Sequence, residues 1–180
     1  FKYLSREWKK NCEEERLLGV SLTGIMDNPL TNGSKRGLDT LLKELRDIAY
    51  ETNKEWADKL GIQRAAAITC VKPSGTVSQL VDSASGIHAR HNPYYVRTVR
   101  ADNKDPLCRF MKAQGFPNEP DVTKPDHTTV FSFPQKSPDG AVCRTDMDAI
   151  EQLELWKIYQ DAWCEHKPSV TISVKEEEWM

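Results

Sequence analysis

The chain is predicted to fold as an α/β protein. Short apolar segments typical of strands alternate with segments whose apolar residues recur at helical spacing, and most helical segments run for about ten residues or more. Helices of that length suit the crossovers between parallel strands. The sequence contains no internal repeat, low-complexity stretch or domain linker. We therefore expect one continuous domain piece over residues 1–180, with parallel strand pairing.

The first half of the chain supplies three helices and two strands. Residues 5–18 are charged with sparse apolar positions, which predicts a surface helix. Residues 18–25 alternate in character and contain glycines near both ends, which predicts a strand. The apolar residues of 38–60 follow one face of an amphipathic helix, and Gly61 is suited to end it. The apolar run 65–71 predicts the next strand, and a short helix is expected after it.

Three further strands are expected in the second half. Residues 94–100 have strand propensity and partial alternation. Residues 128–133 form another apolar run, which Pro134 is expected to end, after a proline-rich loop at 117–127. Residues 169–174 predict the last strand, following a proline that discourages helix before it.

Two helices separate these strands. Residues 106–115 predict a helix, because Pro106 is well placed in a first turn and a glycine ends the pattern. Residues 146–166 predict a longer helix, with Thr145 as the cap and Asp148 three residues on. Its apolar residues cover more than one stripe, so we expect this helix to be buried on much of its circumference.

The composition excludes several classes of function. The 180 residues carry 25 basic and 27 acidic side chains, a net charge of −2, so a strongly basic nucleic-acid surface is not indicated. No apolar run reaches the length of a membrane span, and the start lacks a signal-peptide pattern. We expect a cytoplasmic protein that binds neither nucleic acid nor membrane. The chain begins at Phe1 and ends at Met180 in what resembles a first helical turn, so both ends are expected to be truncations.

The five cysteines predict no disulfide framework and no zinc site. They are widely spaced, odd in number and include no C-x-x-C pair. Each is expected to be a reduced, structural thiol. They are Cys12, Cys70, Cys108, Cys143 and Cys164.

The most informative motif is the turn that begins at Lys72 and reads KPSGTVSQL. The first turn of a helix has unpaired N–H groups and the positive end of the helix dipole. Gly75 allows an anion to approach the backbone, and Ser74 and Thr76 add hydroxyl donors. These properties favour a phosphate site. The competing interpretation is an ordinary strand-to-helix connection capped by serine or threonine.

Other site motifs are absent or have no support from spacing. No glycine precedes Lys72 as a P-loop requires, and the dinucleotide fingerprint G-x-G-x-x-G does not occur. His88, Arg90 and His91 lie close in sequence but lack a third ligand, so we expect polar loop residues rather than a metal site. Solvent-exposed or structural roles are expected for the remaining isolated side chains, namely Arg97, Arg100, His127 and His166.

Several motifs resemble, in the same order, segments of the adenosylcobalamin-dependent (class II) ribonucleotide reductases. They are residues 19–24 (GVSLTG), 68–80 (ITCVKPSGTVSQL) with 83–88 (SASGIH), 94–100 (YYVRTVR) and 163–172 (WCEHKPSVTI). The resemblance covers essentially the whole chain. It implies that residues 1–180 form part of the second half of a ten-stranded α/β barrel, as a single partial domain truncated at both ends.

The same resemblance implies a role for the turn. In the family this segment holds the phosphates of the substrate nucleotide. The residues that inherit this role are Pro73, Ser74, Gly75, Thr76 and Ser78. Lys72 is an accessory candidate that either adds positive charge to the site or points to solvent.

The resemblance also implies an activity. The intact enzyme would convert ribonucleotides, with triphosphates as the expected substrates, to deoxyribonucleotides for DNA synthesis by thiyl-radical chemistry. It would use adenosylcobalamin, the rest of the barrel and a thioredoxin-like reductant. The motifs of the radical cysteine, the Asn/Glu pair and the reducing cysteines are not found in this chain, so no catalytic residue and no metal ligand are assigned, and the isolated chain is expected to be inactive. The alternative is a non-catalytic half-barrel, nucleotide-binding or subunit-docking, from a split or degraded reductase gene.

Overall fold

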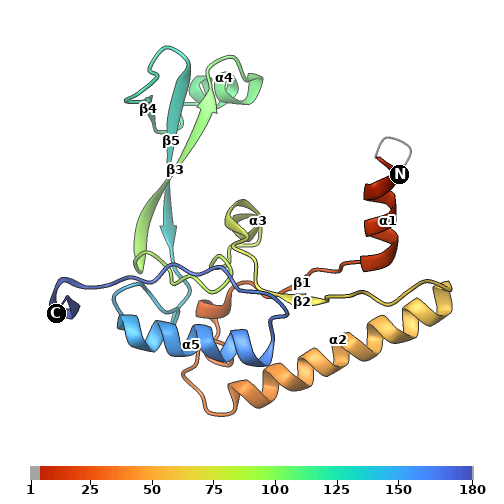
Figure 1. The fold of residues 1–180 in the computed structure, drawn as a ribbon. Coiled ribbons are helices and arrows are strands. Elements are labelled where there is room, and N and C mark those ends of the chain that lie inside the picture. Colours follow the sequence, from red (N-terminus) through yellow and green to blue (C-terminus); the bar gives the residue numbers. More distant parts are fainter. Residues whose placement is uncertain (1–4, 180) are drawn as a thin grey trace. The chain divides into compact units, whose positions relative to one another are not determined.

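The computed structural model describes residues 5–179; residues 1–4 and 180, which the predicted domain includes, lie outside the description. The described residues form two compact units. The first contains the chain up to Arg90 and again from Gly140, and the second is His91–Asp139 (Figure 1). That both units belong to a single partial domain stays a prediction.

The first unit mixes helices with one small parallel sheet. Strands β1 (Val20–Ser21) and β2 (Thr69–Cys70) pair in parallel, with Val20 opposite Thr69. The expected parallel pairing is confirmed here, although both strands are shorter than predicted. The other elements of this unit are α1 (Arg6–Glu15), η1 (Ile25–Asp27), α2 (Leu38–Leu60), α3 (Gly75–Leu80), α5 (Ala149–Ala162) and η2 (Glu176–Glu178).

Helix α2 has the predicted bounds and packs against α5 (Figure 1). It ends where Gly61 takes the left-handed conformation, with φ of 63°. Buried apolar side chains from both helices meet the loops after β1 and β2 in one core. This core comprises Ile25, Met26, Leu38, Leu42, Val71, Ala84, Ile87, Leu155, Tyr159, Ala162, Trp163 and Cys164.

Helix α5 begins later than predicted. Asp148, not Thr145, is the N-cap: its carboxylate accepts the Glu151 amide at 2.7 Å, and the Glu151 carboxylate accepts the Asp148 amide at 3.0 Å. This reciprocal capping box fixes the first turn. The expected burial around much of the circumference is wrong for one side of the helix, since Ile150 is 64% exposed.

The predicted strand at 169–174 does not form. The segment is extended but is held by side chains of α5 instead of a neighbouring strand. The side-chain nitrogen of Gln152 donates to the Ser173 carbonyl at 3.3 Å, and the side-chain oxygen of Gln152 accepts from the Ser173 backbone N–H at 3.2 Å. Trp156 Nε1 donates to the Pro168 carbonyl at 3.1 Å. These bonds satisfy backbone groups that a sheet would otherwise pair.

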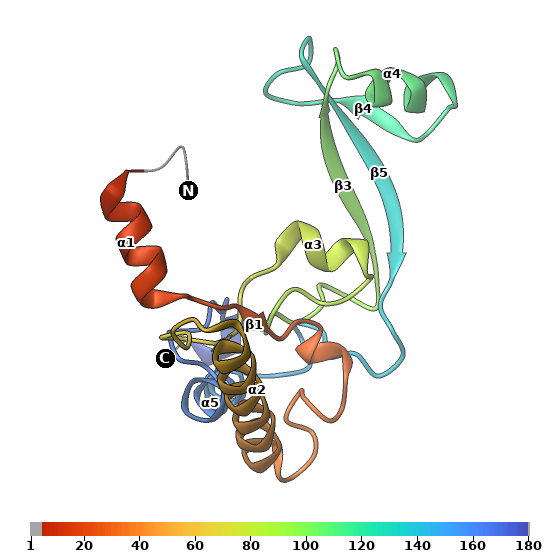
Figure 2. The same cartoon turned by 90° about the vertical axis from the view of Figure 1, so that its right-hand side faces the viewer.

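The second unit is an antiparallel sheet with one helix, so the expectation of parallel pairing is wrong for this part (Figure 2). The strands run in the order β3 (Tyr94–Asp102), β5 (Thr128–Lys136) and β4 (Asn118–Pro120). Helix α4 (Pro106–Ala113) lies between β3 and β4 in sequence, and the Asp105 carboxylate caps it by accepting the Leu107 amide at 2.8 Å.

Strand β5 continues through Pro134, where we predicted its end. Pro134 lies opposite Val96 of β3, while β4 pairs only with the stretch from Thr129 to Phe131. At Pro134 the strand therefore has a neighbour on one side only. Proline is tolerated in a strand when the missing N–H belongs to the open side.

An aspartate organises the loop after β4. The buried Asp121 carboxylate accepts from the Thr123 hydroxyl at 2.6 Å, the Lys124 amide at 3.1 Å and Arg100 Nε at 2.8 Å. The Thr123 hydroxyl and the Arg100 guanidinium hold the pKa of Asp121 well below its usual range. Arg100 is exposed, as expected, and its guanidinium also pairs with Asp121.

Candidate functional site

The predicted phosphate turn follows β2 and leads into α3 (Figure 1). Lys72, Pro73, Gly75 and Thr76 are exposed, while Ser74 is half-buried. Ser74 adopts the left-handed conformation, with φ of 47° and ψ of 26°, which serine rarely takes. The structure therefore presents an exposed, conformationally unusual turn at the position the sequence indicated.

Backbone amides are the donors that this turn offers. The Ser78 amide donates to the Ser74 carbonyl at 2.8 Å and closes the first turn of α3. The amides of Gly75, Thr76 and Val77 precede it and have no intrahelical acceptor. All three residues are exposed, so this part of the backbone lies at the surface. Three adjacent donors of this kind suit an anion with several oxygen atoms.

The side chain of Ser74 is engaged by the protein. Its Oγ lies 2.7 Å from Thr23 Oγ1 and accepts the Gly86 amide at 3.1 Å. The same amide lies 3.0 Å from Thr23 Oγ1, which in turn donates to the Ala84 carbonyl at 3.0 Å. Sequence reasoning missed Thr23, although it lies in the GVSLTG motif quoted above.

Gly86 packs tightly against the turn. A Cβ atom at this position would lie 2.5 Å from the Lys72 carbonyl oxygen, and Gly86 has φ of 50°. Only glycine fits such an approach of one backbone segment to another. The loop containing Gly86 thus fixes where the turn begins.

Ser78 lies in the interior rather than on the surface of the turn. The residue is 0% exposed, its Oγ donates to the Gly75 carbonyl at 3.0 Å, and it lies 2.8 Å from Ser85 Oγ. Its hydroxyl is thus bound to protein groups. A phosphate-binding role for Ser78 stays a prediction, and the geometry gives it a structural task.

Lys72 has a partner that the sequence did not indicate. Its Nζ lies 2.6 Å from His166 Nε2, and its amide donates to Ser21 Oγ at 3.0 Å. His166, expected to be isolated, lies within the 163–172 motif and reaches the start of the turn. The structure thus places a cationic and a titratable side chain at the end of β2.

Arg90 lies in the loop after α3, as expected, and is buried there. It is 4% exposed, and its Nε and Nη2 lie 2.9 Å and 2.8 Å from the two oxygens of Asp27. Nη2 also donates to the Asp82 carbonyl at 2.9 Å, and the Ala84 amide donates to Asp27 at 2.7 Å. These bonds connect η1 to the loop after α3.

His88 is half-buried with Nδ1 2.9 Å from the Ser85 carbonyl, and His91 is exposed.

Glu165 joins the end of α5 to β2. Its carboxylate accepts the amides of Ile68 and Thr69, the latter at 2.8 Å, and the Tyr50 hydroxyl at 2.5 Å. Burial alone would raise the pKa of Glu165, but the hydrogen bonds from Tyr50 and the two amides outweigh burial and lower the pKa below its usual value. The ionised form is therefore the one that the fold binds.

Replacing Glu165 with glutamine is expected to lower the free energy of unfolding at neutral pH by about 1–2 kcal/mol, because charged acceptors make the stronger hydrogen bonds. A carboxyl group with a lowered pKa stabilises the fold while ionised and loses that contribution as the pH falls through its folded pKa. As the pH falls below about 4.3, the free energy of unfolding should therefore decrease less for the variant than for the wild type. Urea unfolding across this range measures the difference. Glu14→Gln, at an exposed ion pair with Lys10, is the control, and equal acid sensitivity of wild type and Glu165→Gln would contradict the prediction.

The cysteines have the character expected from the sequence. All five thiols are free; Cys12 is half-buried and the other four are buried. Burial raises the pKa of Cys164 to about 11 and also raises the pKa of Cys143. Thiols of this kind stay protonated and unreactive at neutral pH. Among residues 5–179, no group of three or more His, Cys, Asp or Glu side chains is placed to hold a metal ion.

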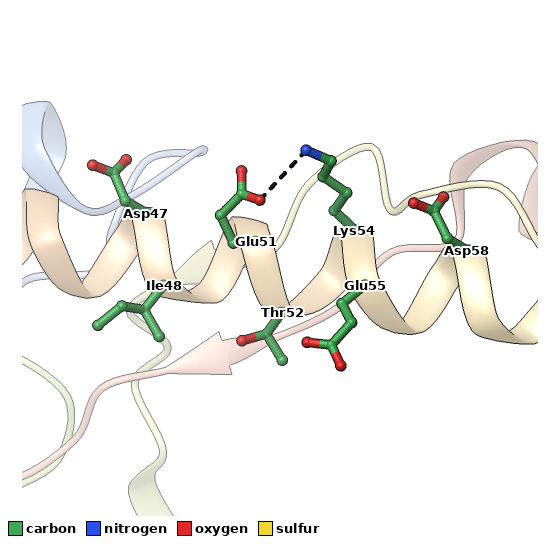
Figure 3. A pocket seen from close by; sticks show the side chains of 7 residues that line it. All are labelled: Asp47, Ile48, Glu51, Thr52, Lys54, Glu55 and Asp58. Carbon is green, nitrogen blue, oxygen red and sulfur yellow. Dashed lines mark hydrogen bonds and ion pairs between the residues drawn. The ribbon is translucent and has the colours of Figure 1, made fainter.

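Two surface hollows of the first unit lie away from the turn. One, of about 480 Å³, runs along α2 alone, and Figure 3 shows its carboxylates with the Glu51–Lys54 ion pair at 3.5 Å. The other, of about 500 Å³, lies between the loop at Asn32 and helix α5. Neither is lined by a residue of 72–78. The α2 hollow has the character of a solvated helix face.

The fold is that of part of a class II ribonucleotide reductase. A crystal structure of a B12-dependent (class II) ribonucleotide reductase superposes with a TM-score of 0.79 and 23% identity, covering 94% of this chain and 28% of that one. No family model matches the chain. In the described residues 5–179, no helix is long and apolar enough to cross a membrane.

Sequence relatives agree with the motifs. An adenosylcobalamin-dependent ribonucleoside-triphosphate reductase of Euglena gracilis is 30% identical over 173 residues, covering 94% of this chain and 24% of the relative. The enzyme of the same name from Lactobacillus gasseri is 27% identical over 198 residues, with 94% and 26% covered. The resemblance to adenosylcobalamin-dependent ribonucleotide reductases is confirmed, and the chain spans about a quarter of the length of the curated relatives it matches.

Proposed function

We propose that this chain is the substrate-phosphate-binding segment of an adenosylcobalamin-dependent ribonucleotide reductase. The intact enzyme would reduce ribonucleoside triphosphates to deoxyribonucleotides for DNA synthesis, in the cytoplasm. The observation that carries the proposal is the exposed turn with three open amides, in a chain that resembles these reductases over 94% of its length.

The chemistry of the turn supports phosphate as its ligand. The amides of Gly75, Thr76 and Val77 would donate to phosphate oxygens, and the Thr76 hydroxyl is exposed beside them. Pro73 carries no N–H and has a restricted φ, so it would limit the flexibility of the chain entering the turn. Held in this way, a nucleotide would present its ribose in a fixed orientation to groups outside the chain.

The remaining parts of the reaction are assigned to other segments. The second half of a ten-stranded barrel, completed by the rest of the enzyme, is the architecture that we propose around β1 and β2. Adenosylcobalamin would initiate thiyl-radical chemistry when bound, and a thioredoxin-like protein would supply electrons. No described residue forms a donor set that fits the cofactor's metal, so we assign none to it and derive no step through it.

Calorimetry with CTP and with cytidine tests the proposal on the full chain. We expect CTP to bind more tightly than cytidine, because the turn would recognise phosphate. Adding the missing part of a related reductase, with adenosylcobalamin and a dithiol, should then give reduction of CTP. Binding without activity would support the non-catalytic half-barrel instead, and equal binding of CTP and cytidine would contradict phosphate recognition by the turn.

Lys72→Ala is expected to weaken CTP binding by about two- to fivefold, the effect of one exposed charge near an anion. The difference should shrink in about 1 M salt, where charges are screened within ~3 Å. Titration calorimetry at low and high salt measures both effects. Lys54→Ala, on the exposed face of α2, is the control and should bind CTP like the wild type. An unchanged affinity in Lys72→Ala would remove Lys72 from the site.

A further inference from the structure

We infer that Thr23 is a positioning residue for the phosphate turn, holding Ser74 in the conformation that presents the exposed amides. The inference rests on the proposed function of the turn and adds to it a residue 51 positions away in the sequence. Thr23 follows β1, whereas Ser74 follows β2. The parallel pairing of the two strands brings these two hydroxyl groups to the same end of the sheet.

The first argument concerns backbone conformation. Ser74 has φ of 47°, and a left-handed conformation is unfavourable for a residue with a side chain. Such a conformation persists where surrounding contacts hold it. At Ser74 the contacts are made through Oγ, which lies 2.7 Å from Thr23 Oγ1 and 3.1 Å from the Gly86 amide.

The second argument is a count of protons. Each hydroxyl has one proton to donate. Thr23 Oγ1 donates its proton to the Ala84 carbonyl at 3.0 Å, so the proton between the two hydroxyls comes from Ser74. Both protons are used within the protein. In this arrangement Ser74 anchors the turn, and its neighbours' amides are left to bind the ligand. A direct phosphate-binding role for the Ser74 hydroxyl stays a prediction.

The third argument is the shared amide. Gly86 donates to both Thr23 Oγ1 and Ser74 Oγ, at 3.0 Å and 3.1 Å. The two hydroxyls and the amide are therefore hydrogen-bonded to one another in a single cluster. Removing the Thr23 hydroxyl takes away the acceptor of the Ser74 proton and one of the two acceptors of the Gly86 amide.

Calorimetry of Thr23→Val with CTP and cytidine tests the inference. We expect the affinity for CTP to fall by about tenfold and that for cytidine to stay unchanged, since losing the hydrogen bonds of the Thr23 hydroxyl to Ser74, Ala84 and Gly86 misplaces the phosphate donors. Thr23→Ser, which restores the hydroxyl, should bind CTP within about twofold of wild type. In a double-mutant cycle with Ser74→Ala, the two losses should not add, because both variants break the same bond.

Thr31→Val is the matched control. Thr31 Oγ1 donates to the Ile25 carbonyl at 2.8 Å, so this variant loses a similar bond in the same unit away from the turn. Its CTP affinity should match the wild type. Wild-type CTP affinity in a folded Thr23→Val variant, or an equal loss in Thr31→Val, would overturn the inference. If Thr23→Val does not fold, CTP binding by Ser74→Ala, which keeps the bond from Thr23 to Ala84, is measured instead. Wild-type CTP affinity in a folded Ser74→Ala variant would then overturn the inference. Failure of the wild type to distinguish CTP from cytidine would instead overturn the proposed function.

Discussion

Arg90→Leu is expected to lower the free energy of unfolding by about 3–5 kcal/mol, the usual cost of removing one partner of a buried ion pair. Arg90 is 4% exposed and contacts both carboxylate oxygens of Asp27. Without it, the Asp27 carboxylate keeps only the Ala84 amide among these partners. Small domains are stable by only about 5–15 kcal/mol, so this loss would affect a large part of the total. Urea or thermal unfolding measures it.

Two variants make this prediction specific. Arg64→Leu removes an exposed arginine whose Nη2 lies 3.5 Å from Asp58, and should cost less than about 1 kcal/mol. The double variant Arg90→Leu with Asp27→Leu leaves no buried unpaired charge from this pair, since the other carboxylate near Arg90, Asp82, is exposed, and it should be more stable than Arg90→Leu alone. A loss below about 1 kcal/mol in Arg90→Leu would show that the pair does not hold η1 to the loop after α3.

Gly86→Ala is expected to destabilise the chain by about 2–4 kcal/mol and to abolish most of the preference for CTP over cytidine. The new Cβ would lie 2.5 Å from the Lys72 carbonyl oxygen, a backbone atom that can move only with the turn. Overpacking of this kind adds to the cost of a left-handed conformation for alanine. Chemical unfolding and calorimetry with CTP measure the two effects.

Gly61→Ala is the matched control for Gly86→Ala. Gly61 has φ of 63°, close to that of Gly86, but a Cβ there meets nothing within 4 Å. It should therefore show only the conformational cost, about 1–2 kcal/mol, and unchanged CTP binding. Equal losses of stability in the two variants would mean that the contact with the Lys72 carbonyl is relieved without strain.

Elements defined by local chemistry were predictable from the sequence. The bounds of α2 follow from the spacing of its apolar residues and from Gly61, and α4 begins at Pro106 as expected. The position of the turn followed from a strand pattern that leads into KPSGTVSQL. In each of these cases the determining residues lie within a few positions of one another.

Features that depend on distant residues were not predictable. The Arg90–Asp27 pair joins residues 63 positions apart, and the bond from Glu165 to the Thr69 amide spans 96 positions. Neither charge has a sequence pattern that indicates its partner. The antiparallel order of the second unit was missed because helix–strand alternation suggested crossovers, while β5 returns beside β3 after a short helix and strand β4.

Because the five cysteines differ in burial, the rates at which their thiols are labelled can report local unfolding of the chain. Cys12 is the half-buried thiol and is accessible to a labelling reagent first, while the other four react only when the surrounding structure opens. Cys70, Cys143 and Cys164 belong to the first unit and Cys108 to the second. The rates at which these native thiols are modified would therefore give separate opening free energies for the two units, without introducing a probe.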